Sequence, residues 1–298
     1  MKHELQRTND GVAFEDGVLP LRDGRKLAWR WLGEPDWIPV LRFQGMPGSR
    51  VSRSPDPSIQ HDLGVRYLQA DRPGYGGSTR KPGRGIADVA DDYAELMDAL
   101  DLDRLPASGV SGGGPHVLAF AARHPSRIKA VTVVVGAAPL TPDEAAGLVE
   151  LNARAYIAKQ KGWDEVFAVL SAAREEMLRE GGVPYVFNGA PASDEVALAR
   201  PAVQRVLVEN VMEALRQGAE GWADESFAMR SDWDFDPGAI RTSVTWWHGD
   251  GDRNAPLSAA RRAVARIPHA NLRVWQGEGH LALSHEAEVV SELLSRSR

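Results

Sequence analysis

The stretch LPASGVSGGGPHVLAFAAR, residues 105–123, determines how the rest of the chain is interpreted. It begins with a strand-like run, Leu105–Val110, and ends with an alanine-rich, helix-like run, Pro115–Arg123. Between them, residues 109–113 fit the pattern G-x-S-x-G, in which a serine occupies a sharp turn between a strand and a helix. Glycines two residues before and after the serine allow the strand and helix to approach each other. The pattern predicts that Ser111 is a nucleophile; the alternative is a plain glycine turn with Ser111 as N-cap.

Strand-like and helix-like runs alternate on both sides of this stretch. The other predicted strands are Val18–Pro20, Lys26–Leu32, Val40–Phe43, Val65–Ala70, Ile128–Val135, Ser243–Trp247 and Leu272–Trp275. The other predicted helices are Ile86–Leu100, Leu257–Arg266 and Leu281–Leu294. Apolar strands that alternate with helices are typical of a parallel sheet covered on both faces, so we predict an α/β fold.

The alternation stops between about residues 140 and 235, which are rich in Ala, Glu, Leu and Arg and contain no convincing strand. Thr141 followed by Pro142 is a favourable helix start, and later glycines and prolines divide the region into several helices. We therefore predict a core domain of residues 1–139 and 236–298, interrupted by a helical insertion of residues 140–235.

The composition excludes several classes of chemistry. The 298 residues include no cysteine, which excludes disulfides, thiolate catalysis and cysteine-ligated metal sites, and we expect no metal or cofactor. The net charge of −6 gives no support to a nucleic-acid partner. No run approaches the ~20 apolar residues of a membrane span, and residues 1–10 lack the apolar core of a secretion signal. We expect a cytoplasmic protein without a membrane partner; a homodimer remains open.

A serine hydroxyl needs a base to remove its proton, and His280 is the predicted base. It follows the last predicted strand in Gln276-Gly277-Glu278-Gly279-His280, so it lies at the same C-terminal edge of the sheet as Ser111. The seven other histidines occupy positions less suited to this role: His3, His61, His116, His124, His248, His269 and His285.

The third member of such a site orients the imidazole and stabilises its charged form. Trp247-His248-Gly249-Asp250-Gly251-Asp252 ends the preceding strand and offers two carboxylates. We predict that Asp252 is the acid, because it lies further into the turn, and that Asp250 is a turn residue. For the oxyanion hole we predict the backbone N–H groups of Gly112 and Met46.

Together these residues resemble the α/β-hydrolase superfamily, in particular its cap-bearing, esterase-like branch. The resemblance rests on five motifs in order: residues 43–48, 71–78, 109–113, 248–252 and 277–280. It implies an eight-stranded, mostly parallel sheet flanked by helices, with one antiparallel strand near its start and a helical cap over the site. One departure is Gln44, where relatives usually carry histidine; we expect Gln44 to support the oxyanion loop by hydrogen bonding. The motif Asp71–Ser78 is interpreted as a structural turn.

A serine at position 111 disfavours dehalogenases and most epoxide hydrolases of this superfamily, which use aspartate there. The leading expectation is hydrolysis of a small-molecule carboxylic ester through an acyl-enzyme. Thioester, lactone, amide and C–C bond hydrolysis and perhydrolysis remain open, as does a non-catalytic small-molecule receptor. A proline-releasing aminopeptidase needs an acidic site for the substrate's α-amine, for which the insertion offers Glu144, Glu150, Asp224 and Glu225.

Aromatic and apolar side chains in the insertion are candidates for substrate contacts. We single out Trp163, Trp222 and Trp233 as substrate-binding residues, with Phe167, Phe227 and Met229 as further candidates. The alternative is ordinary packing between helices, because apolar stripes on helices usually face a core.

Overall fold

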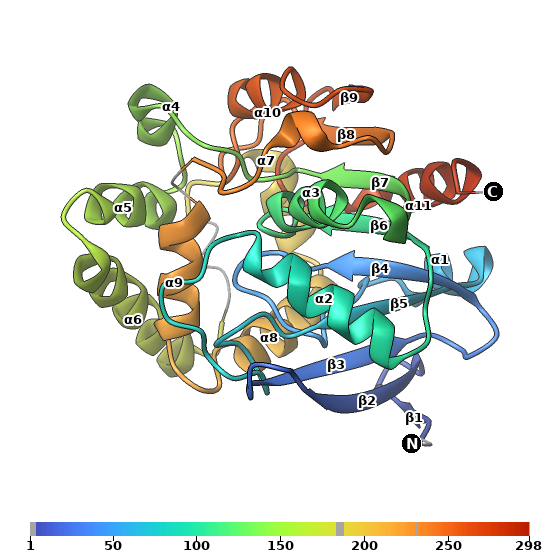
Figure 1. Ribbon diagram of the computed structural model, residues 1–298. Helices are drawn as coiled ribbons and strands as arrows, with labels where there is room; N and C mark the ends of the chain where they lie inside the picture. Colours follow the sequence, from blue (N-terminus) through green and yellow to red (C-terminus); the bar gives the residue numbers. More distant parts are fainter. Residues whose placement is uncertain (1–3, 183–187, 230–231, 298) are drawn as a thin grey trace.

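The computed structural model describes residues 4–182, 188–229 and 232–297 (Figure 1). Within them, nine strands form one sheet in the order β1-β2-β3-β5-β4-β6-β7-β8-β9. The strands are β1 Gln6–Arg7, β2 Ala13–Pro20, β3 Lys26–Leu32, β4 Ile38–Phe43, β5 Val65–Ala70, β6 Leu105–Val110, β7 Ile128–Val134, β8 Val244–Gly249 and β9 Ala270–Trp275. The predicted α/β architecture is confirmed.

The sheet is parallel from β5 to β9 and antiparallel at its beginning. The pairs β5/β4, β4/β6, β6/β7, β7/β8 and β8/β9 are all parallel. By contrast, β1/β2, β2/β3 and β3/β5 are antiparallel. The expectation of eight strands with one antiparallel strand was therefore one strand short. The additional strand, β1, has only two residues, too few to produce an alternating sequence pattern.

Helices cover both faces of the sheet. On one face lie α2 Asp88–Ala99, α3 Gly113–Arg123 and α10 Leu257–Val264, which share a core with strand residues such as Phe43 and Val131. On the other face, α11 Glu286–Ser295 packs against Val40 and Val65. The last predicted helix begins later than expected, because residues 283–285 form a short 3-10 turn. The short helix α1, Pro57–Leu63, was not predicted.

Between β7 and β8 the chain forms a helical segment, residues 140–235, which includes the undescribed residues 183–187 and 230–231. Its helices are α4 Pro142–Ala146, α5 Glu150–Lys159, α6 Trp163–Glu180, α7 Ala192–Leu198, α8 Pro201–Ala214 and α9 Glu220–Met229. Thr141 caps α4 in the predicted way, as part of a capping box with Glu144. The helices of this segment form a second core, which includes Leu170 and Trp222 and is shared with Tyr75.

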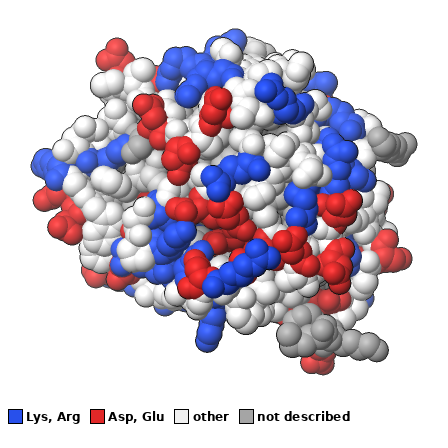
Figure 2. Space-filling model, viewed as in Figure 1, with Lys and Arg blue, Asp and Glu red and all other residues white. Residues whose placement is uncertain are grey.

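Figure 1 relates the helical segment to the sheet: the arrowheads of β4 and β7 point toward α5 and α9. The C-terminal edge of the parallel strands therefore faces this segment, and this is the edge at which ligand sites of open α/β sheets form. On the face seen in Figure 2, acidic and basic side chains are interspersed over much of the surface. None of the described helices is long and apolar enough to cross a membrane.

Candidate active site

Ser111 occupies the turn between β6 and α3 in an unusual backbone conformation. Its φ angle is 53°, in the left-handed region that residues with a side chain rarely adopt. Its backbone N–H donates to the carbonyl of Val134 at 2.9 Å, and its own carbonyl accepts from Gly114 at 2.9 Å and from Ala137 at 3.0 Å. These bonds tie the turn to β7 and to α3 and hold the strained conformation in place.

The predicted need for glycine around Ser111 has a steric cause. A Cβ atom at Gly109 would lie 2.5 Å from the carbonyl oxygen of Gly113. A Cβ atom at Gly113 would collide with the carbonyl oxygen of Phe43. Larger residues at these positions would separate α3 from the strands that it contacts.

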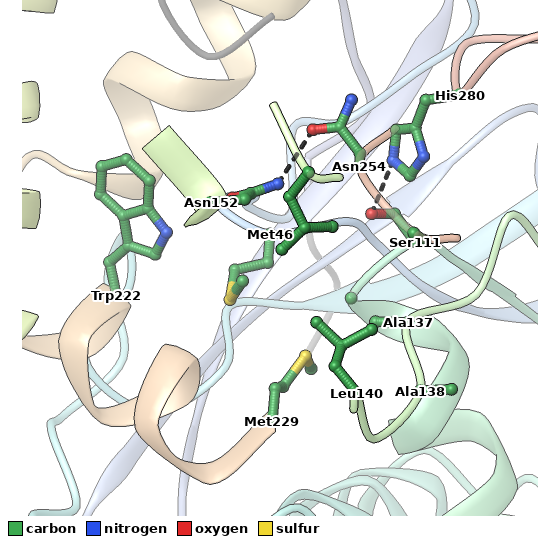
Figure 3. Close-up of a pocket in the computed structure, with 13 residues that line it drawn as sticks. Met46, Ser111, Ala137, Ala138, Leu140, Asn152, Trp222, Met229, Asn254 and His280 are labelled. Atoms are coloured by element: carbon green, nitrogen blue, oxygen red, sulfur yellow. Dashed lines mark hydrogen bonds between the residues drawn. The ribbon is translucent and has the colours of Figure 1, made fainter. Parts of the chain in front are cut away.

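His280 lies between Ser111 and Asp252 and is hydrogen-bonded to both. Its Nε2 lies 2.9 Å from Ser111 Oγ, as Figure 3 shows, and its Nδ1 lies 2.8 Å from Asp252 Oδ2. The side chain of His280 is 9% exposed and that of Asp252 is fully buried. Burial alone would lower the pKa of His280, but the charge of Asp252 and its hydrogen bond outweigh this effect and raise the pKa above its ordinary value.

The two aspartates of the loop after β8 have different partners. The second oxygen of Asp252, Oδ1, accepts from the backbone N–H groups of Asn254 at 2.8 Å and Ala255 at 2.9 Å, which fixes the carboxylate toward His280. Asp250 instead accepts from the backbone N–H of Gly277 at 2.8 Å and is exposed. The structure therefore brings Asp252, and not Asp250, to His280.

His248 is the other histidine near the carboxylate. Its ring Nε2 lies 3.5 Å from Asp252 Oδ2, but the same nitrogen has a closer partner in the carbonyl of Ala255, at 2.7 Å. Burial lowers the pKa of His248, in spite of the opposing charge of Asp252. His248 is thus a neutral side chain that lies next to the Asp252 carboxylate and is hydrogen-bonded to the carbonyl of Ala255. Of the other candidates considered in the sequence, His3 lies outside the described residues.

Two backbone N–H groups lie beside Ser111, at the positions predicted for an oxyanion hole. A Cβ atom on Gly112 would lie 3.2 Å from the backbone nitrogen of Met46, and one on Gly45 would lie 3.5 Å from Ser111 Cβ. Among the described residues, no carbonyl or side chain accepts a hydrogen bond from the N–H of Met46 or of Gly112. Within this part of the chain, both donors are thus without a protein acceptor.

Gln44 and Arg72 support the loop that carries Met46 through hydrogen bonds. The Gln44 side chain donates to the carbonyl of Ala70 at 2.7 Å, which agrees with the supporting role expected for it. Arg72 donates to the carbonyls of Gln44 at 2.6 Å and Gly45 at 2.7 Å. The turn motif at residues 71–78 thus supports the loop, although the sequence did not indicate that Arg72 is the contact.

A pocket opens beside Ser111, bounded by the sheet edge and the helical segment (Figure 3). It is lined by Met46, Ser111, Gly112, Ala137, Ala138, Leu140, Leu148, Asn152, Trp222, Met229, Asn254, Ala255 and His280. Its cavity volume is about 80 Å³, small beside the ~150 Å³ of a cavity that holds benzene. Apart from His280, the lining side chains are neutral and mostly apolar.

Of the three tryptophans predicted to touch substrate, Trp222 alone is among the described residues that line this pocket. Trp163 instead stacks on Phe167 and donates its indole N–H to Asp224 at 2.8 Å. Trp233 packs in the main core and stacks on Phe235. Both indoles pack within the protein, so a substrate contact of Trp163 or Trp233 stays a prediction that this pocket does not support. Met229 does line the pocket, whereas Phe167 and Phe227 do not.

The four acidic residues considered for binding an α-amine do not line the pocket either. Glu225 and Asp224 are buried and paired with Arg72 and Arg80, respectively. Glu144 is paired with Arg262, and Glu150 lies 3.7 Å from Arg154 on the surface of α5. Within the described residues, no group of three His, Asp or Glu side chains is placed to hold a metal ion.

One residue at the site was missed in the sequence: Asp194, on α7. Its side chain is 1% exposed, and it accepts hydrogen bonds from the backbone N–H groups of His280 and Leu281, both at 2.9 Å. A Cβ atom on Gly279 would lie 2.5 Å from this carboxylate, so the glycine allows the close approach. No local motif marks Asp194, because its partners lie more than eighty residues away along the chain.

Comparisons with known proteins agree with this fold. A family model described as alpha/beta hydrolase fold matches residues 38–287. A non-heme chloroperoxidase from Streptomyces lividans is 28% identical over 282 residues, which cover 92% of this chain and 96% of that protein. A proline iminopeptidase from Neisseria gonorrhoeae is 25% identical over 252 residues, covering 83% of this chain and 69% of that one.

Solved structures support the fold. A bromoperoxidase from Bacillus anthracis superposes with a TM-score of 0.70 and 20% identity, covering 94% of this chain and 99% of that chain. A thermophilic esterase from Thermogutta terrifontis superposes with a TM-score of 0.65 and 20% identity, covering 95% of this chain and all of that chain.

Proposed function

The chain belongs to the alpha/beta-hydrolase family, and from this premise we propose that it hydrolyses a small, neutral carboxylic ester through a covalent acyl-enzyme. The observation that carries the proposal is the hydrogen-bonded series from Ser111 Oγ to His280 Nε2, 2.9 Å, and from His280 Nδ1 to Asp252 Oδ2, 2.8 Å. In this series Ser111, His280 and Asp252 have the order expected of a nucleophile, a base and an orienting acid.

In the proposed first step, His280 Nε2 takes the proton of Ser111 as Oγ attacks the ester carbonyl carbon. The carbonyl oxygen becomes an oxyanion and accepts hydrogen bonds from the N–H groups of Met46 and Gly112. When the tetrahedral intermediate collapses, the bond to the alcohol oxygen breaks and His280 returns the proton to this oxygen. The alcohol leaves, and Ser111 carries the acyl group.

In the second step, a water molecule takes the place of the serine hydroxyl. His280 accepts its proton as the water oxygen attacks the acyl carbon, and the bond to Ser111 Oγ then breaks. The carboxylic acid is released, and His280 returns the proton to Ser111. Throughout, Asp252 holds the imidazole with Nδ1 protonated and stabilises its charged form.

The pocket supports a small, uncharged substrate. Among the described residues, its walls offer no charged side chain apart from His280, so a charged substituent would lose its hydration without gaining a partner there. The cavity of about 80 Å³ suits a short acyl or alcohol group. The helical segment supplies Leu148, Asn152, Trp222 and Met229 to the pocket, which supports its proposed role as a cap over the site.

The same pocket argues against a proline-releasing aminopeptidase, even though a proline iminopeptidase is among the relatives. Such an enzyme needs an acidic group for the α-amine, and Glu144, Asp224 and Glu225 are all engaged by arginines away from the lining. Glu150 lies on the surface of α5, outside the lining.

Perhydrolysis is the second candidate, favoured by the likeness to a non-heme chloroperoxidase over almost the whole chain. Hydrogen peroxide would replace water in the second step, so that acyl transfer from Ser111 releases a peracid and regenerates the serine. Peracid formed from acetate and hydrogen peroxide by the wild type, but not by Ser111→Ala, would establish this activity.

The deciding experiment for the main proposal is covalent labelling with a fluorescent organophosphonate, combined with stopped-flow kinetics on a p-nitrophenyl ester. The wild type should label once per chain and release a burst of nitrophenol as the acyl-enzyme forms. Ser111→Ala should fold, fail to label and lose turnover by several orders of magnitude. Labelling that persists in Ser111→Ala would refute the proposal, and saturable ester binding without any burst would indicate a receptor.

A further inference from the structure

Glu225, on α9, is a fully buried carboxylate outside the pocket lining. It accepts hydrogen bonds from Arg72 Nε at 3.0 Å and from Arg84 Nη2 at 2.9 Å, and its Oε1 forms an ion pair with Arg72 Nη2 at 2.8 Å. His116 Nε2 lies 3.2 Å from the same group. Burial alone would raise the pKa of Glu225, but the charges of Arg72 and Arg84 hold it far below its usual range. The carboxylate is therefore ionised and engaged by three side chains.

Arg72 connects this carboxylate to the loop of Met46. The guanidinium is fully buried and also donates to the carbonyl oxygens of Gln44, 2.6 Å, and Gly45, 2.7 Å. The Gly45 carbonyl and the Met46 N–H belong to one planar peptide group. Because the two bonds of a trans peptide point in opposite directions, fixing the Gly45 carbonyl also fixes the direction of the Met46 N–H.

His116 connects Glu225 to the other side of the oxyanion hole. It lies in the first half of α3, the helix that has Gly112 as its N-cap residue. Its second ring nitrogen, Nδ1, lies 3.1 Å from the carbonyl of Ile86, so the imidazole is held between α9 and the segment that precedes α2. The position of α3, and with it the Gly112 N–H, is thereby tied to Glu225.

From these contacts we infer that Glu225 is a positioning residue that aligns both donors of the oxyanion hole, Met46 through Arg72 and Gly112 through His116. The inference rests on the proposed function and adds to it. The helical segment then contributes more than pocket walls, because a carboxylate on its last helix fixes the groups that stabilise the transition state. Glu225 itself does not line the pocket, so its loss should affect the transition state more than substrate binding.

The test compares Glu225→Gln with Asp224→Asn, a matched control on the same helix. Asp224 is also buried and paired with an arginine, Arg80, but among the described residues its hydrogen-bond partners are Arg80 and Trp163 and not residues of the Met46 loop or α3. Rates on a p-nitrophenyl ester are divided by the number of active sites that phosphonate titrates, so unfolded protein does not contribute. Removing one oxyanion donor costs about 10²–10³ in kcat, and misaligning both donors should cost about 10–100-fold.

For Glu225→Gln, kcat should fall by this factor while KM stays within about twofold, and Asp224→Asn should keep both constants near those of the wild type. A trifluoromethyl ketone, which forms a tetrahedral adduct with the serine, should lose affinity in proportion to the loss in kcat. Equal losses in the two variants, or a raised KM with unchanged kcat, would overturn the inference.

Arg72→Lys provides an independent test and decides the matter if Glu225→Gln does not fold. Lysine keeps the buried positive charge beside Glu225, but a single ammonium cannot span both carbonyls and the carboxylate as the planar guanidinium does. We expect kcat per titrated site to fall at least tenfold at unchanged KM; kcat equal to that of the wild type would overturn the inference. The proposed function is refuted by persistent labelling of Ser111→Ala, whereas the role of Glu225 is refuted by the kinetics of the Glu225 and Arg72 variants. The two outcomes are therefore distinguishable.

Discussion

The carboxylate of Asp194 accepts a hydrogen bond of 2.9 Å from the backbone N–H of His280, and thus a buried residue of α7 holds the loop that carries the proposed base. The other carboxylate oxygen accepts from the next N–H of the loop, that of Leu281, also at 2.9 Å. The charge of Asp194 also contributes to the raised pKa of His280, after the larger effects of burial and Asp252. One side chain of the helical segment therefore influences both the position and the protonation of His280.

Asp194→Asn should lower kcat about tenfold, because an amide offers one acceptor oxygen to two N–H groups and leaves one of them unpaired. It should also move the acid limb of the pH–rate profile to lower pH, since a negative charge that raises the pKa of His280 is lost. Glu195→Gln is the control, because Glu195 is the adjacent, exposed residue of α7. Profiles that coincide for the two variants would show that Asp194 has no influence on His280.

Asp252→Asn should reduce kcat by about 10⁴, the loss known for the equivalent change in a serine protease. Asp252 Oδ1 is already committed to the N–H groups of Asn254 and Ala255, so the new amide would direct its NH₂ group toward His280. The imidazole would then accept at Nδ1 and carry its proton on Nε2, where it cannot take the proton of Ser111. Steady-state kinetics on one ester provide the measurement.

The matched comparison is Asp250→Asn, two residues earlier in the same loop. Asp250 is exposed and contacts the backbone of Gly277, so its loss should cost less than tenfold in kcat. Comparable losses at the two positions would mean that the acid has been assigned wrongly.

Residues that the structure brings together at this site could be selected from the sequence where they belong to a local pattern. Ser111 is marked by the small residues around it, and His280 and Asp252 by their places after consecutive strands. Asp194 and Glu225 carry no such mark, because each acts on residues that are remote in sequence and shares its helix with other acidic residues. The local sequence pattern shows which strand ends carry polar residues. It does not show which helix packs against such a strand end, because this depends on tertiary contacts.

The same limit explains where the fold and the pocket lining differ from the sequence predictions. The strand β1 has two residues, too few for any periodic signal. Trp163 and Trp233 lie in the segment that lines the pocket, yet their indoles face other partners. Hydrophobicity predicts that a tryptophan is buried, but the packing of neighbouring helices determines which residues surround it.

Activity should rise with pH through a single acid limb, because only neutral His280 can accept the proton of Ser111. Since the pKa of His280 is raised, the midpoint for kcat/KM should lie above 6.5, the ordinary value for histidine. Below the midpoint the imidazole is protonated and inactive; above it the base is available. An acid limb with its midpoint below pH 6 would contradict this assignment. So would a kcat/KM that does not change between pH 5 and pH 9.

The last prediction concerns Trp222, a residue of α9 that is 2% exposed and forms part of the pocket wall. Replacing it by alanine should enlarge a cavity that now measures about 80 Å³, so the preferred acyl chain should lengthen by several carbons. Hydrolysis of a small activated acetate should change much less, because an acetyl group does not extend to this wall. Chain-length profiles on a series of p-nitrophenyl esters provide the measurement.

Trp233→Ala is the control for Trp222→Ala. Both changes remove a buried indole and should lower stability by about 3–5 kcal/mol, but Trp233 packs in the main core and lies outside the pocket lining. General loosening of the protein would affect both profiles alike, whereas a wall that limits chain length predicts a shift for Trp222 alone. If Trp222→Ala is too unstable to assay, Trp222→Leu retains much of the packing and should produce a smaller shift in the same direction. A profile identical to the wild type in both Trp222 variants would mean that Trp222 does not bound the acyl site.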